Sequence, residues 1–135
     1  MSNYLTWIIS IVIALVYYKS SIQKMLNPLV FKKIISDYDL IKSDHLQLHA
    51  SLLITSLELT IAVFILFPST RLISVLAGTL LQIIFIIALS CNLGKTFDNG
   101  CGCFRMNTPQ TISMKSIYVN FLLLLALCFD AYLIL

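Results

Sequence analysis

Four long apolar segments constrain what this chain can fold into. They span about 4–22, 46–67, 72–93 and 113–135, and a bilayer-spanning helix needs roughly 20 mostly apolar residues. Hydrophobic residues make up 59% of the chain and charged residues 11%, whereas soluble domains carry roughly 25% charged residues. The bilayer must therefore solvate much of the apolar surface. We predict an all-α integral membrane protein, a single domain over 1–135 that forms a four-helix up-down bundle.

The first apolar segment could also be read as a secretory signal peptide. However, no Lys or Arg precedes it, and Tyr17, Tyr18 and Lys19 occupy the place of a small-residue cleavage site. We therefore expect this segment to be a retained helix.

The connection between the first two spans has the pattern of an amphipathic helix over about 28–42. Asn27 and Pro28 are a cap residue and a first-turn residue. Apolar residues then recur at helical spacing, while Lys32, Lys33 and Asp37 take the other face. Such a helix is expected to lie along the membrane surface or over the mouth of the bundle. A plain solvated linker remains the alternative.

Span parity places two connections on one side of the membrane. With four spans, the segments 19–45 and 94–112 share a face, and both termini share the other. The first of these faces carries most of the Lys and Arg residues, which favours a cytoplasmic position for it. Lasting disulfides belong to oxidising compartments, which favours the outside. We expect the 94–112 loop outside a bacterial inner membrane and both termini in the cytoplasm.

That loop contains Cys101 and Cys103, separated by Gly102. Two thiols this close form a tight, strained disulfide, and strained exposed disulfides are the labile or catalytic kind. Lys95 and Arg105 favour the reactive thiolate. The pattern predicts thiol–disulfide chemistry centred on Cys101 and Cys103.

The other thiols and the histidines leave alternatives open. Cys91, near the same membrane face, is either a resolving or relay thiol or a small buried apolar residue. Cys128 lies near the opposite face, where it cannot meet Cys101. His45 and His49 share one helix face, so with Cys101 and Cys103 they form an alternative zinc or copper site.

Polar residues also occur inside the spans. Glu58 and Gln82 lie about eleven residues into the second and third spans, so they match in depth and are expected to hydrogen-bond. Lys24 is expected to snorkel to the interface, and Asp130 to reach the far surface. Asn120 is expected to bond across helices. Ionisable groups inside a membrane are costly, which makes each of them a functional hypothesis.

These residues together resemble the MauE branch of the DoxX-like membrane proteins. The resemblance rests on Lys24 to Pro28 followed by an amphipathic segment, Glu58, Asn92 with Gly94, Cys101 to Phe104, and Asn120 to Leu123. Arg105 replaces the glycine expected after Phe104, and Asn99-Gly100 stands where an acidic residue often precedes the first cysteine. The bundle also resembles, more distantly, the vitamin K epoxide reductase-like proteins.

The resemblance implies a redox-associated membrane protein, because MauE itself is associated with maturing a disulfide-rich periplasmic subunit. We expect a thiol–disulfide oxidoreductase or its accessory subunit, with an exported or thioredoxin-like partner and quinone as the electron acceptor. The alternatives are a non-enzymatic scaffold subunit of a larger membrane complex, with a structural cysteine clip, and a metal-binding protein. The modest net charge of +3, with no basic run, argues against a nucleic-acid partner.

Overall fold

The computed structural model describes residues 2–102 and 108–135, and within them helices dominate. The elements in chain order are α1 (Ser2–Leu26), α2 (Pro28–Asp37), α3 (Asp44–Phe64), α4 (Arg71–Cys91), β1 (Thr96–Phe97), β2 (Gln110–Thr111) and α5 (Met114–Ile134). Helices α1, α3, α4 and α5 are long and apolar enough to cross a membrane. The predicted fold class is confirmed: four candidate spans with a short helix between the first two.

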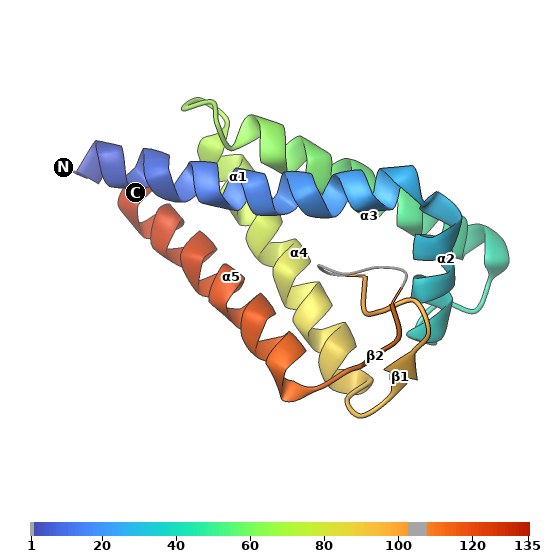
Figure 1. Ribbon diagram of the computed structural model, residues 1–135. Coiled ribbons are helices and arrows are strands. Elements are labelled where there is room, and N and C mark those ends of the chain that lie inside the picture. Colours follow the sequence, from blue (N-terminus) through green and yellow to red (C-terminus); the bar gives the residue numbers. More distant parts are fainter. Residues whose placement is uncertain (1, 103–107) are drawn as a thin grey trace.

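The four long helices pack as two neighbouring pairs. Helix α1 packs along α3, and α4 packs along α5. Figure 1 shows the two chain termini close together at one end of the bundle, where α5 approaches α1. Toward the other end α5 diverges from α1, and α2 and the β1–β2 hairpin occupy that end. The predicted arrangement of 19–45 and 94–112 at one end of the bundle is confirmed for the described residues of both segments.

The core lies where the two pairs cross. Ile13, Tyr17, Ile61, Val75 and Leu127 are nearly inaccessible there and come from all four long helices. Gly78 allows the close approach, because a Cβ at this position would lie 3.2 Å from Leu127 and 3.4 Å from the Tyr17 hydroxyl. Many large apolar side chains face outward, as expected where lipid is the solvent.

Helix α2 covers the open end of the bundle. Phe31, Ile34 and Ile35 are buried and pack against α3, which leaves Lys33 and Ser36 exposed. The helix begins at Pro28, as predicted, but ends at Asp37 and not near residue 42. Asp39 adopts a φ of 55°, a left-handed conformation that terminates the helix.

The connection between α4 and α5 contains two short strands, β1 near its start and β2 near its end, which pair as a hairpin. Strands β1 and β2 pair antiparallel, with Thr96 opposite Thr111 and Phe97 opposite Gln110. Phe97 and Ile112 are buried together with Leu89 of α4 and with Cys101. The hairpin thus fixes the first cysteine of the loop against the end of α4.

Candidate functional site

A buried ion pair joins α1 to α3. Lys24 Nζ lies 2.7 Å from Glu58 Oε1, and each side chain is only 1% exposed. The Ser20 hydroxyl accepts from Lys24 at 3.1 Å and donates to Glu58 Oε2 at 3.3 Å. The expectation that Lys24 snorkels to the interface is wrong. Its carboxylate partner lets the ammonium stay inside, because a buried charge is tolerated when it is paired and hydrogen-bonded.

Two aromatic rings complete the surroundings of the Lys24 ammonium. Its Nζ lies 4.8 Å from the ring centroid of Phe31 on α2 and 5.3 Å from that of Phe85 on α4. Cations over ring faces at these distances are attracted by the ring quadrupole. Lys24 therefore links α1 to three other helices: α2, α3 and α4.

A second polar chain crosses from α1 to α5. The Tyr17 hydroxyl donates to Gln82 Oε1 at 3.2 Å, and the Gly78 carbonyl oxygen lies 3.1 Å from it. Gln82 Nε2 donates to Asn120 Oδ1, and Asn120 Nδ2 donates to the Ser116 carbonyl oxygen at 2.8 Å. The prediction that Glu58 and Gln82 hydrogen-bond is wrong. Glu58 bonds to Lys24, whereas Gln82 bonds to Tyr17 and Asn120. The cross-helix bond expected of Asn120 is confirmed.

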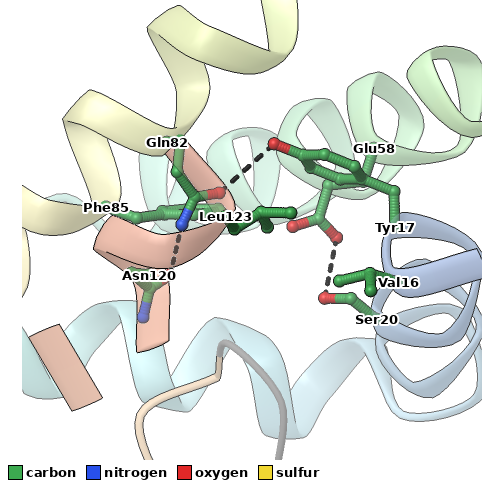
Figure 2. A pocket seen from close by; sticks show the side chains of 8 residues that line it. All are labelled: Val16, Tyr17, Ser20, Glu58, Gln82, Phe85, Asn120 and Leu123. Carbon is green, nitrogen blue, oxygen red and sulfur yellow. Dashed lines mark hydrogen bonds between the residues drawn. The ribbon is translucent and has the colours of Figure 1, made fainter. Parts of the chain in front are cut away.

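The ion pair and the polar chain face the same small cavity. Figure 2 shows Glu58 with Ser20 on one side of it and Gln82 with Asn120 on the other. The cavity measures about 10 Å³, on the scale of one water molecule, and its lining is completed by Val16, Tyr17, Phe85 and Leu123. Lys24, Glu58, Gln82 and Asn120, all singled out from the sequence, thus lie in one neighbourhood contributed by α1, α3, α4 and α5.

Sequence reasoning missed Tyr17 and Ser20 as members of this neighbourhood. Their spacing carried the signal, since Tyr17, Ser20 and Lys24 are three and four residues apart and so share one face of α1. Ser10 extends that face toward the termini.

Cys101 is buried and held by α2. The Tyr38 hydroxyl, just past the end of α2, donates to the Cys101 carbonyl oxygen at 2.6 Å. The Tyr38 ring meets Phe97 edge-on, with ring centroids 4.9 Å apart. The Cys101 side chain is 5% exposed. Cys103 falls outside the described residues.

Gly102 meets two separate demands. Its φ of +78° lies in the left-handed region, which favours glycine. A Cβ there would lie 3.0 Å from Ile34 Cγ2 and 3.1 Å from Phe31 Cε2. The backbone beside Cys101 is thus pressed onto the same Phe31 ring that contacts Lys24.

Cys101 lines two cavities of different character. One, the polar cavity, measures about 270 Å³ and lies at the start of α5. Its other lining residues, most of them polar, are Gln110, Ser113, Lys115, Ser116, Val119 and Asn120. The other, about 150 Å³, lies beneath α2 and has an apolar surface, with Phe31, Ile35, Ile54, Ile84, Phe85 and Ala88 among its lining residues. Cys101 thus contributes to the lining of both cavities.

The remaining predicted site residues lie apart from these cavities. Cys91, the last residue of α4, is exposed, as is Cys128 on α5. His45 and His49 are exposed near the start of α3. Within 2–102 and 108–135, no three His, Cys, Asp or Glu side chains gather as metal ligands. The alternative site that includes Cys103 extends beyond those ranges.

A second polar cluster lies at the terminal end of the bundle. Asp130 is fully buried and accepts from the Ser10 hydroxyl at 2.9 Å, so the expectation that it reaches the surface is wrong. Arg71 is also buried; its Nε donates to the Ile65 carbonyl oxygen at 3.1 Å, and its guanidinium lies 4.3 Å from the Trp7 ring centroid. This cluster joins α1, α4 and α5 far from Cys101.

Comparison with known proteins agrees with the motifs. The family described as "Methylamine utilisation protein MauE" matches residues 2–133. No curated protein and no solved structure matches the chain. The matched range covers α1, α3, α4 and all but the last residue of α5, together with the Lys24–Glu58 pair and Cys101, so the resemblance expected from the sequence is confirmed. The chain is a multi-pass membrane protein and belongs to the MauE family.

Proposed function

We propose that this protein exchanges disulfides through Cys101 and Cys103 with an exported partner protein, as an oxidoreductase or as the redox subunit of a larger membrane complex. The observation that carries the proposal is the position of Cys101 between a polar cavity and an apolar cavity. In this proposal a protein thiol from the aqueous phase approaches through the first, and a lipid-soluble molecule approaches through the second. The loop then faces the extracytoplasmic side, where disulfides persist.

The apolar cavity suits the ring of a quinone as electron acceptor. A cavity of about 150 Å³ lined by apolar side chains is large enough for one six-membered ring. When the Cys101–Cys103 disulfide forms, the two thiols lose two electrons and two protons, and the quinone gains both to become a quinol. Cys91 lies outside this cavity, so the proposal gives it no relay role.

The buried ion pair has a positioning role in this proposal. The Lys24 ammonium lies over the Phe31 ring, and Gly102 packs against the same ring. Phe31 and Phe85 are both walls of the apolar cavity and both contact the ammonium. The pair thus fixes the wall of the acceptor site and the backbone that carries the thiol.

A non-enzymatic scaffold role is the second proposal, favoured by the deep burial of Cys101 and the Tyr38 hydrogen bond. In that case a Cys101–Cys103 disulfide would be a structural clip. A redox titration separates the two roles: a clip resists mild reductant, whereas an exchanging pair is reduced and reoxidised readily.

Mixed-disulfide trapping tests the leading proposal. In a Cys103→Ser variant the Cys101 thiolate should attack a disulfide of an exported protein and release one of that protein's thiolates. The reductant-sensitive complex should accumulate, because the resolving thiol of this chain is gone. The Cys101→Ser/Cys103→Ser variant should form none, and a Cys91→Ala/Cys128→Ala variant should behave like the wild type. A complex that persists without both loop cysteines would rule out the loop as the exchange site.

A further inference from the structure

The polar cavity beside Cys101 contains a side chain whose hydrogen bonding is incomplete. Gln110, on strand β2, lines this cavity together with Ser116 and Asn120. Within the described part of the chain, Gln110 Oε1 is buried and has no hydrogen-bond donor. Its amide nitrogen donates to the Ser116 hydroxyl at 3.4 Å, which is a long contact. Buried polar atoms in native proteins rarely lack a protein or water partner, so this acceptor has the capacity for a further donor.

Asn120, the buried polar residue of the same cavity wall, is already paired. Asn120 accepts from Gln82 and donates to the Ser116 carbonyl oxygen. Strand β2 is fixed by its pairing with β1, and Ile112, the next residue but one, is almost fully buried. Gln110 therefore lies on a paired strand and lines the same cavity as Cys101.

We propose that Gln110 hydrogen-bonds a backbone peptide group of the partner, in the extended segment that carries the partner's cysteine. This inference rests on the proposed function and specifies its substrate class as a polypeptide. A carboxamide is the natural match for a peptide group, since each has one carbonyl acceptor and an N–H donor. The recognition involves backbone atoms, so it is independent of the side chains that flank the partner's cysteine.

Substrate class is tested by comparing two thiol-specific reagents on the full chain in detergent, with Cys91 and Cys128 replaced by Ala and Cys103 by Ser. The first is an extended peptide whose cysteine is activated as a mixed disulfide with thionitrobenzoate. The Cys101 thiolate attacks the peptide sulfur, and the released thionitrobenzoate thiolate reports the rate. The second is methyl methanethiosulfonate, which has no peptide group and measures the reactivity of Cys101 alone.

The ratio of the two rates isolates recognition from reactivity. Gln110→Met, which keeps the length but removes the carboxamide, should lower the peptide rate about fivefold and leave the methanethiosulfonate rate unchanged, since one net hydrogen bond is worth about this factor. Thr111→Val is the matched control, because Thr111 is the adjacent residue on β2 and its exposed hydroxyl pairs with Thr96. It should leave the ratio unchanged.

A second arm avoids any change to the protein. Peptides N-methylated at, before or after the cysteine lose one backbone N–H each. With the protein that retains Gln110, one of these peptides should react about fivefold more slowly than the unmethylated peptide. With the Gln110→Met variant, that peptide and the unmethylated peptide should react at the same rate. Equal ratios for both proteins with every peptide would overturn the inference while leaving disulfide exchange intact. If Cys101 reacts with methanethiosulfonate but never with any peptide disulfide, the proposed function fails as well.

Discussion

At the residue scale, the Lys24–Glu58 pair is the feature on which the interior depends most. Both side chains are almost fully buried, and each satisfies the other. A buried ion pair often contributes little net stability, but removing one partner leaves an uncompensated charge. The same ammonium also contacts Phe31 and Phe85, so its loss should be felt in α2 and α4.

We therefore predict that Lys24→Met lowers the free energy of unfolding in detergent by about 3–5 kcal/mol. The Lys24→Met/Glu58→Met variant should recover most of that loss, because no charge is left unpaired. Lys19→Met is the control on the same helix, where the lysine is exposed, and it should change little. Additive losses in the double variant would show that the two side chains do not act as a pair.

Gly102 offers a second prediction at this scale. Gly102→Ala combines a left-handed backbone with a clash against Ile34 and Phe31, and should loosen the loop and raise the alkylation rate of Cys101. Gly94→Ala is a matched control, since its φ is +87° but its Cβ would meet nothing within 4 Å. Both variants incur the backbone cost of about 1–2 kcal/mol, so a difference between them measures the contact with α2. Identical alkylation rates would exclude that contact as the constraint on Cys101.

The sequence predicted which polar residues lie in the interior, but it did not predict which of them hydrogen-bond to one another. Lys24, Glu58, Gln82 and Asn120 stood out because polar groups are rare in apolar spans. Depth along a helix could be counted at about 1.5 Å per residue, which led to the expected Glu58–Gln82 bond. Rotation of each helix about its axis could not be derived from depth, and that rotation decides that Glu58 faces Lys24.

At the element scale, α2 and the hairpin together determine the position of Cys101. Their contact brings Asp37 of α2 near Asp98, which follows β1. Burial raises the pKa of Asp37 above its ordinary value; the Lys33 charge opposes this shift and the Asp98 charge adds to it. The folded protein therefore binds this proton more tightly than the unfolded chain does.

The consequence is a stability that falls as the pH rises from the ordinary aspartate pKa through the raised one, because in this range the unfolded chain has released the proton first. Asp37→Asn should remove this slope and make the protein more stable than the wild type at neutral pH. Thermal unfolding in detergent between about pH 3 and 7 measures how stability depends on pH in the wild type and in the variant. Parallel curves for the two proteins would contradict a raised pKa at Asp37.

The elements themselves were predictable to different degrees. The start of α2 was predicted by Pro28. Its end depends on the left-handed backbone of Asp39, and the presence of an aspartate does not predict that conformation. The hairpin was not predicted, since β1 and β2 are two residues each and are fixed by the burial of Phe97 and Ile112. Short strands carry too little alternation to be recognised.

At the scale of the whole molecule, the count of spans decided the architecture. Parity alone placed α2 and the cysteine loop at one end, as the structure has them. The divergence of α5 from α1 toward that end, and the cavities that flank Cys101, depend on how the helices cross. Crossing geometry follows from side-chain packing on each helix, so a hydropathy pattern could not give it.

Orientation in the membrane is the property on which the proposed function depends. The same end that holds Cys101 carries most of the Lys and Arg residues, which the positive-inside rule would place in the cytoplasm. An exchange partner outside the cell requires the opposite orientation. The two arguments make opposing predictions about which aqueous phase reaches the loop.

Thiol labelling in intact cells tests this central claim most directly. In a Cys91→Ala/Cys128→Ala variant, whose remaining thiols are Cys101 and Cys103, a membrane-impermeant maleimide is added with and without an impermeant phosphine reductant. We predict labelling from outside, greater after reduction and absent when both loop cysteines are Ser. Labelling that requires permeabilised cells, with or without reductant, would place the thiols in the cytoplasm and contradict exchange with an exported partner.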